Sequence, residues 1–318
     1  MPRKPSHFAR SDLLRPLRSF CVAARTGSMS RAAEELYLSQ PSVSLQIRSL
    51  EEALGAMLFE RRGPQIRLTT EGEILFDLAR PLVEGIDALP ETLAARLGRL
   101  ESGQVNIAAG ESTILYILPE LVSRFRSRYP SVHVHLHNVT GKDGLTMIRN
   151  EEVDFAIGSM IDVPADIRYE PIYSFRPMLI TAPDHPLANL DRVRLKDLSP
   201  YGLILPPKRL TTWRIVDFTF QRFDVPYEVS LEVGGWEVIK RYVSLDMGIS
   251  IVTSICLTDE DRLFSYDMSE YFPRRSYGLV MKKSRFVSPQ AQKFIDLVRQ
   301  NRSLQRLEKA AGDHITEA

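Results

Sequence analysis

Two amphipathic helices separated by a tight break constrain the N-terminal part of this chain most strongly. The first follows Ser28, a typical capping residue, and carries the small pair Ala32–Ala33, which lets another helix approach closely. After a break at 37–39, the segment QPSVSLQIRSLEEALG places Pro41 in a first helical turn. Its apolar stripe consists of Val43, Ile47, Leu50 and Leu54. With polar residues at the start of the second helix, the pattern predicts a helix-turn-helix that can enter a major groove of DNA.

A preceding helix and a following hairpin complete this small domain. Leu13, Leu17, Phe20 and Ala24 recur at helical spacing, and Gly27 ends that helix. Leu58–Phe59 return to the core, and ERRGPQIRLTTEG is predicted to form a basic hairpin, or wing, with a turn at 63–64. The wing is either a solvated charged hairpin or, beside a helix-turn-helix, a contact for phosphates or a minor groove.

Charge is distributed unevenly along the 318 residues. Residues 1–70 carry eleven Lys and Arg against six Asp and Glu, a balance of +5, whereas the whole chain has a net charge of +1. A basic head on a mildly acidic body suggests that the head meets a polyanion. The hydrophobic fraction of 44% and the charged fraction of 25% are typical of a globular protein with two or three domains.

The segment from Gly27 to Glu73 closely resembles the DNA-binding region of LysR-type transcriptional regulators. The resemblance rests on residues at fixed spacing, among them Ser39-Gln40-Pro41-Ser42, the run Ile47, Leu50, Glu51, Leu54 and Gly55, then Leu58-Phe59, Arg61 and Leu68-Thr69 with Gly72. Leu45 stands where many members carry Arg or Lys. The resemblance extends over nearly the whole chain and is weaker after residue 100.

The resemblance implies specific DNA contacts. Residues expected to face the groove are Gln40, Pro41, Ser42, Ser44 and Gln46, because Gln pairs with adenine edges and Ser with several bases. Residues expected to hold phosphates or flank a narrow groove are Arg31, Arg48, Arg61, Arg62 and Arg67.

Residues 71–100 are predicted to form a linker helix that Thr70 caps. Its stripe consists of Leu75, Leu78, Leu82, Ile86, Leu89, Leu93 and Leu97. Such a stripe must be buried, either against the chain's own body or, as the resemblance implies, against a second copy in a homodimer or homotetramer. Pro81 and Pro90 are expected to bend or break the helix.

Residues 104–302 alternate between strands and helices, which predicts parallel sheets covered by helices. Two such units, with the strand at 277–281 and the helix at 288–301 returning to the first, resemble the periplasmic-binding-protein fold, the effector domain of LysR-type regulators. The predicted fold is therefore α/β, with a winged helix-turn-helix (1–70), a linker helix (71–100), a two-lobed effector-binding domain (104–302) and a flexible tail (303–318).

Ligands in open α/β sheets bind beyond the carboxyl ends of strands. Here those ends supply Glu111, Ser112, Thr113, Thr140, Gly141, Thr211, Thr212 and Trp236, with Lys208, Arg209 and Arg214 nearby. Hydroxyls and free amides at helix starts favour an anionic or carboxylate effector, although Ser112 and Thr113 can equally be simple caps. Glu111 binds an amine of a zwitterion or points outward, and Trp236 stacks on a ligand or covers a sheet.

Several functional classes find little support. His133, His135 and His137 alternate along one strand, but Val132, Val134 and Leu136 are expected to face the core and no further ligand cluster completes a metal site. No nucleophile elbow, catalytic triad or phosphate-cradling loop occurs, so neither an enzyme nor a cofactor is expected. The two cysteines are expected to be buried thiols, and no membrane span or signal peptide is apparent, which predicts a cytosolic protein.

The sequence therefore predicts a ligand-responsive transcription regulator. Its expected partners are promoter DNA, a small-molecule effector, further copies of itself and RNA polymerase. The alternative is a solute-binding receptor that uses the two-lobed body, which the basic head and the missing signal peptide oppose.

Overall fold

The computed structural model describes residues 13–62, 65–97, 102–139 and 141–301. Contacts divide the described chain into two compact units. The first holds the residues up to 97 together with 283–289, and the second holds 102–282 together with 290–301. The start of the head, 1–12, and the predicted tail, 303–318, lie outside the described residues.

Three helices build the head, and local capping chemistry sets their limits. They are α1 (Leu14–Thr26), α2 (Met29–Glu35) and α3 (Gln40–Leu54). Gly27 and Gly55 end α1 and α3 with φ values of 65° and 67°, a left-handed conformation that glycine adopts without a Cβ clash. Ser28 and Ser39 cap α2 and α3 as side-chain acceptors. The common core contains Phe20, Ala23, Ala32, Val43, Ile47, Leu50 and Leu58.

The wing is an antiparallel pair, β1 (Phe59–Arg62) and β2 (Gln65–Leu68), and its predicted turn at 63–64 lies outside the described residues. The following helix α4 (Thr70–Asp87) begins one residue earlier than predicted, because Thr69 rather than Thr70 is its cap. The Thr69 hydroxyl accepts from the Gly72 amide at 3.0 Å and donates to the Met57 carbonyl at 2.7 Å. One side chain therefore fixes both the helix start and the loop before the wing.

Pro81 was expected to bend or break the linker helix; it does not break it, because α4 is continuous through this residue. The break falls at Ala88, and α5 (Leu89–Arg96) then carries Pro90 in its first turn, where a missing amide costs no hydrogen bond. Six members of the predicted stripe are 42–64% exposed in this chain. They are Leu78, Leu82, Ile86, Leu89, Leu93 and Leu97.

The first lobe of the second unit is a five-stranded sheet in the order β4-β3-β5-β12-β6. Its strands are β3 (Gly103–Ala109), β4 (Val132–Asn138), β5 (Phe155–Gly158), β6 (Ile167–Phe175) and β12 (Arg275–Lys282). Helices α6 (Leu118–Arg128) and α10 (Pro289–Gln300) cover one face, where Phe125 and Phe155 pack on Phe294. Helix α7 (Gly141–Arg149) covers the other face, where Ile148 packs with Ala108 and Val280.

This sheet is mixed, which corrects the predicted all-parallel arrangement. Strands β3, β4 and β5 are parallel, but β12 runs antiparallel to both β5 and β6. Strand β6 was not predicted. Strand β4 lies at the edge of the sheet, which explains why Leu136, expected in the core, is 38% exposed. His133 and His135 are exposed on the same strand.

The second lobe places β7 (Pro177–Thr181) between the antiparallel strands β10 (Ser250–Thr253) and β11 (Phe264–Asp267). A parallel pair, β8 (Leu203–Leu205) and β9 (Val229–Glu232), adjoins it through a bridge from Leu203 to Ile249. Successive residues of β7 face different helices. Leu179 packs in the cluster that contains α8 (Thr211–Arg222), and Ile180 packs in the cluster that contains α9 (Trp236–Ser244). Short 3-10 helices occupy Pro186–Asn189, Leu195–Leu198 and Ser254–Cys256.

Two neighbouring chain segments connect the lobes. Strand β6 leads through Arg176 into β7, and the chain returns at the start of β12. Arg275 is paired with Phe175 in the β6–β12 ladder, so both crossings lie side by side. The predicted winged helix-turn-helix, linker helix and two-lobed α/β body are all present, and the pairing places Arg275 at the junction of the lobes.

Candidate DNA-binding surface and effector cavity

The polar start of α3 carries most of the predicted base contacts. Gln40 and Pro41 are exposed, and Ser42 and Ser44 are half-buried. Ser42 is tied to the cap, because its amide donates to Ser39 Oγ at 3.3 Å and the two hydroxyls lie 2.8 Å apart. Gln40 Nε2 donates to Ser44 Oγ at 2.9 Å. Local hydrogen bonds therefore hold these side chains in defined positions.

Gln46 has a different surrounding from the other predicted base contacts. Its Oε1 accepts a 2.7 Å hydrogen bond from Ser19, which lies on α1 and is 1% exposed. The bond satisfies a buried hydroxyl and fastens α3 to α1. No local sequence signal points to Ser19, because its contact with Gln46 joins residues 27 positions apart.

Backbone contacts position the wing. Glu51 Oε1 accepts from the amides of Leu58, at 2.8 Å, and Phe59, at 3.4 Å, so a carboxylate of α3 holds the entry to β1. The Ile66 amide donates to the Gly27 carbonyl at 3.4 Å. The cationic side chains of Arg31, Arg48 and Arg67 are exposed around α3 and the wing, whereas the side chains of Arg61 and Arg62 lie outside the described residues.

A cavity of about 470 Å³ lies within the second unit, where the ends of β3 and β5 face the starts of α8 and α9. All of the described effector-site predictions line it, and Thr140 lies outside the described residues. The lining residues among them are Glu111, Ser112, Thr113, Gly141, Thr211, Thr212 and Trp236. Lys208 is directed elsewhere, because its Nζ lies 5.3 Å from the centre of the Trp213 ring.

Helix starts converge on this cavity. Thr113, which is 1% exposed, begins a five-residue π-helical turn (η2, Thr113–Ile117) that leads into α6. No side chain caps this turn, α8 or α9 in the described structure. Uncapped starts leave backbone amides free for an anionic group, and π-helical turns often occur at functional sites.

Arg275 is a cavity residue that the sequence analysis missed. Its Nη1 donates to the hydroxyl of Thr212, and its guanidinium carbon lies 5.6 Å from the centre of the Tyr277 ring. Its Nε is buried and has no hydrogen-bond partner among the described residues. Lys142, Arg209 and Arg214 also line the cavity. Together with Arg275 these make four cationic side chains in the lining, whereas Glu111 and Asp162 are its two anionic ones, so the lining has a net positive charge.

Glu111 contacts the start of α9. A Cβ at Gly235, whose φ is 86°, would lie 3.1 Å from both Glu111 carboxylate oxygens. A carboxylate at a helix N-terminus is electrostatically favourable. The Glu111 carboxylate therefore has a favourable position beside the start of α9.

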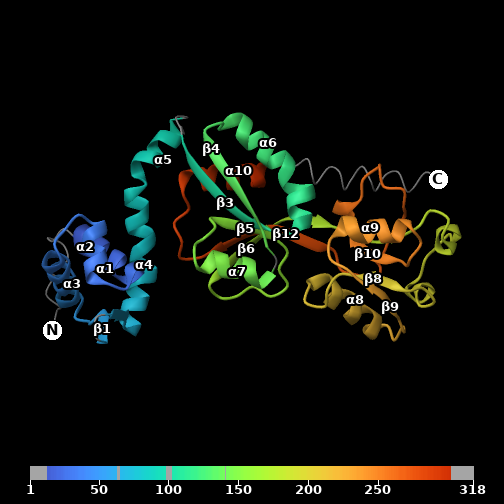
Figure 1. The fold of residues 1–318 in the computed structure, drawn as a ribbon, viewed down its shortest axis with the longest axis horizontal. Helices are drawn as coiled ribbons and strands as arrows, with labels where there is room; N and C mark the ends of the chain where they lie inside the picture. The colour runs from blue at the N-terminus through green and yellow to red at the C-terminus, as the bar shows by residue number, and fades with distance from the viewer. Residues whose placement is uncertain (1–12, 63–64, 98–101, 140, 302–318) are drawn as a thin grey trace, which may run out of the picture. The chain divides into compact units, whose positions relative to one another are not determined.

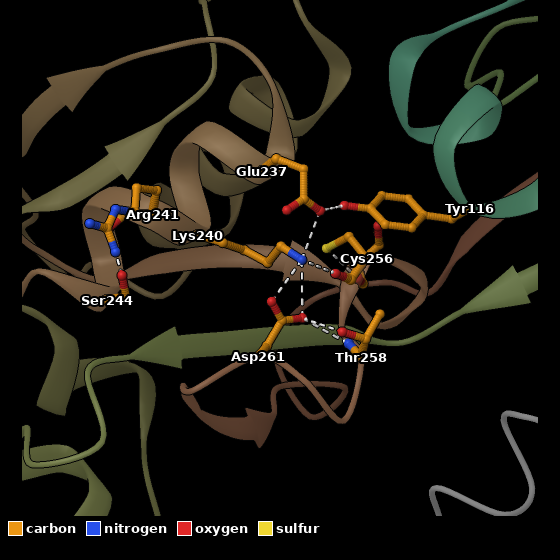
Figure 2. A network of polar contacts seen from close by, with 9 residues as sticks. Tyr116, Glu237, Lys240, Arg241, Ser244, Cys256, Thr258 and Asp261 are labelled. Carbon is orange, nitrogen blue, oxygen red and sulfur yellow. Dashed lines mark hydrogen bonds and ion pairs between the residues drawn. The ribbon is translucent and has the colours of Figure 1, made fainter.

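Beside the cavity, a polar cluster around a buried lysine joins the segment after β3 to the second lobe (Figure 2). Lys240 is 5% exposed, and its Nζ lies 2.8 Å from Glu237 Oε1, 2.9 Å from Asp261 Oδ1 and 2.8 Å from the Cys256 carbonyl. The Tyr116 hydroxyl, from the π-helical turn, donates to Glu237. The same turn therefore contributes Thr113 to the cavity and Tyr116 to this cluster.

Charge pairing outweighs burial in this cluster. Burial alone would lower the pKa of Lys240, but Glu237 and Asp261 raise it above its ordinary value. Burial would raise the pKa of Asp261, but the Thr258 amide and Lys240 lower it overall. Burial raises the pKa of the Cys256 thiol to about 12, and that of Cys21 likewise to about 12, so both thiols stay protonated and unreactive at neutral pH.

Two family models match, in chain order, the two parts described above. Residues 14–73 match the bacterial regulatory helix-turn-helix protein model of the lysR family, and residues 98–303 match the LysR substrate binding domain. The chain belongs to the LysR family. It is a ligand-responsive, DNA-binding transcription regulator, and the alternative of a solute-binding receptor is not favoured, because the helix-turn-helix match accounts for the head.

Relatives and solved structures of the LysR family align with most of the chain. The RuBisCO operon transcriptional regulator of Allochromatium vinosum is 30% identical over 289 residues, covering 90% of this chain and 95% of that protein. A crystal structure of full-length CbnR complexed with its target DNA has 21% identity and a TM-score of 0.55, covering 90% of this chain and 98% of that one. The effector binding domain of QuiR in complex with shikimate has 22% identity and a TM-score of 0.58, covering 63% and 97%.

Two further findings concern the described residues alone. Within them, no helix is long and apolar enough to cross a membrane. The same part of the chain holds no group of three or more His, Cys, Asp or Glu side chains arranged to bind a metal ion, and this includes the histidines of β4.

Proposed function

We propose that this LysR-family regulator responds to a small carboxylate or related anion bound in the cavity between its two lobes. The observation that carries the proposal is Arg275, whose buried Nε lacks a partner in the described structure and whose Nη1 is held by Thr212. A half-buried guanidinium with a free Nε donor is a strong ligand for carboxylates, because charge-assisted hydrogen bonds are stronger than neutral ones.

Residues from both lobes would contact such an anion. Ser112 and Thr113 offer a hydroxyl pair at an uncapped turn, and Thr211 and Thr212 offer hydroxyls at the uncapped start of α8. Trp236 would cover the apolar part of the ligand. The related QuiR domain was solved with shikimate, a carboxylate, which supports this ligand class. Contacts from both lobes would make the ligand favour one lobe arrangement over another.

On DNA, α3 would enter the major groove with Gln40, Pro41, Ser42 and Ser44 toward the bases. The side chains of Arg31, Arg48, Arg61, Arg62 and Arg67 would contact the backbone or flank the groove. Gln46 would act mainly by holding α3 on α1, since its Oε1 already accepts from Ser19. CbnR was solved with its target DNA, which supports promoter binding by this fold.

The exposed stripe of α4 and α5 supports assembly with a second copy, since apolar side chains at helical spacing gain stability by burial against a partner helix. A tetramer and contact with RNA polymerase follow from the family resemblance. We also infer that the regulator has no enzymatic activity. Promoter DNA of bacteria lies in the cytosol, so we expect the protein to act there.

Sequencing the DNA fragments that the full-length protein binds would test the DNA-binding part and supply an operator. Footprints on that operator would then be compared with and without each member of a panel of small carboxylates, phosphates and amines. We expect a carboxylate to change the footprint and Arg275→Gln to weaken its effect roughly tenfold or more. The double variant Ser112→Ala with Thr113→Val should abolish the response and keep DNA affinity. A normal response in either variant would show that the cavity is not the effector site.

A further inference from the structure

Leu45 is an exposed apolar side chain on the helix that is proposed to enter the major groove. It is 68% exposed, whereas Val43, Ile47 and Leu50 of the same helix are buried. At about 100° per residue, Leu45 lies about 200° around the helix axis from Val43. It therefore points directly away from the core of the head. Pro41, one turn earlier, is exposed on the same face.

The surroundings of Leu45 are those of a polyanion-binding surface. Arg48 follows on the next turn, and Arg31 and Arg67 are exposed on the neighbouring elements α2 and β2. Residues 1–70 carry a balance of +5. A membrane or a protein partner would leave these cations less well matched than DNA, whose phosphates would surround an inserted helix.

The polar neighbours of Leu45 are occupied by local hydrogen bonds. Ser44 Oγ accepts from Gln40 Nε2 at 2.9 Å, and Ser42 Oγ lies 2.8 Å from Ser39 Oγ. Among the described residues of α3, Leu45 thus offers a large apolar surface at the centre of the outward face, between side chains that are already oriented. Burial of that surface in a groove is most favourable against an apolar group on the DNA, because both partners then lose apolar contact with water.

We propose that Leu45 recognises thymine by packing on its C5-methyl group, which makes it a specificity-determining residue of this regulator. The thymine methyl is the apolar group that base pairs display in the major groove. The inference rests on the proposed docking of α3, and it adds a base preference that none of the polar side chains of α3 explains.

The test replaces thymine by deoxyuridine, which removes the methyl group and leaves the hydrogen-bonding edge intact. Full-length protein first selects duplexes from a random pool, and each thymine of the selected site is then replaced singly. We expect one uracil position in each half-site to weaken wild-type binding about fourfold, from the loss of one buried methyl group. For Leu45→Ala, thymine and uracil duplexes should bind equally at that position.

Two variants make the result specific to this side chain. Leu45→Met keeps an apolar chain of similar volume and should retain the preference for thymine. Leu190→Ala removes an exposed leucine of the second lobe and should behave as the wild type in every duplex.

The possible outcomes are distinguishable. If the wild type selects a site but no uracil effect depends on residue 45, Leu45 does not contact a thymine, although the proposed function stands. If Leu45→Ala changes the oligomeric state in light scattering while the uracil effect persists, a second copy covers Leu45 and the inference is wrong. If the wild type selects no sequence at all, the proposed docking of α3 fails and the inference fails with it.

Discussion

The Nζ atom of Lys240 lies 2.9 Å from Oδ1 of Asp261, and this ion pair fastens α9 to the loop that follows the Ser254–Cys256 turn. Glu237 shares the same ammonium and also accepts from Tyr116, which belongs to the turn that begins at Thr113 (Figure 2). One cluster therefore links a wall of the cavity to the interior of the second lobe.

Replacing Lys240 by Met should destabilise the second unit. The variant leaves the Cys256 carbonyl and the Asp261 carboxylate without their buried cation, and removal of one member of a buried ion pair costs about 3 kcal/mol or more. Urea unfolding monitored by tryptophan fluorescence measures the loss, because Trp213 and Trp236 both lie in this unit. Lys196→Met, at an exposed position, is the matched control and should change the free energy of unfolding by less than about 0.5 kcal/mol.

Asp261 should give the second unit a stability that depends on pH. Its pKa in the folded chain lies below the ordinary value of 3.8, because the Thr258 amide and Lys240 outweigh burial. A group with a lowered folded pKa stabilises the folded state above its unfolded pKa and loses that contribution as pH falls through the folded value. Unfolding free energies should therefore drop below about pH 4, and Asp261→Asn should flatten that part of the curve. An unchanged acid limb in the variant would show that Asp261 contributes nothing to it.

Gly72 should be required by a close backbone approach inside the head. A Cβ at this position would lie 2.1 Å from the Leu58 carbonyl oxygen. Gly72→Ala should thus cost about 2 kcal/mol by overpacking. Gly85 is the control in the same helix, because its Cβ would meet the Phe286 ring at an ordinary 3.5 Å. Gly85→Ala should stabilise α4 by about 0.5–1 kcal/mol, so opposite shifts of the thermal midpoint are expected.

The head could be predicted in detail because its signals are local. Ser28, Gly27 and Pro41 each act within a few residues of their place in the chain, and the structure confirms the predicted cap, stop and first-turn proline. The cap at Ser39 was not predicted, although it is equally local. The cap of α4 was predicted one residue late, because Thr69 and Thr70 are equivalent by sequence alone. The Thr69 contact with the Met57 carbonyl distinguishes them only in three dimensions.

The body was predicted less completely because its sheets depend on distant pairings. Strands β6 and β11 were missed, and both pair antiparallel with strands far away in the sequence. Arg275 was missed because its place in the cavity depends on the pairing of β6 with β12. It follows Ser112, which also lines the cavity, by more than a hundred residues in the sequence. Ser112, Thr113, Thr211, Thr212 and Trp236 line the cavity because each follows the carboxyl end of a strand, which is a general rule of α/β sheets.

Charged residues in the linker stripe should prevent assembly. Leu82 and Leu93 are 64% and 60% exposed in the single chain, so Leu82→Glu with Leu93→Glu should leave its fold intact. Burying two carboxylates in a helix interface is costly, and light scattering should show monomers where the wild type forms dimers or larger species. The control Asp77→Glu, at an exposed position of α4, should assemble as the wild type does. Assembly of the double variant as the wild type would remove the stripe from the interface.

Base and phosphate contacts on the head should separate by their salt dependence. Ser42→Ala should weaken binding to the selected operator by roughly 1–3 kcal/mol and relax base preference, with little effect on unrelated duplexes. Arg67→Ala should weaken all duplexes alike and reduce the slope of log affinity against log salt by about one. Fluorescence anisotropy across a salt series measures both quantities on the same duplexes. Gln46→Ala is expected to lower head stability as well, since it leaves the buried Ser19 hydroxyl without its acceptor, so its binding must be compared at equal folded fraction. If Arg67→Ala changed sequence preference while Ser42→Ala changed only the salt slope, α3 would not be the element that contacts the bases.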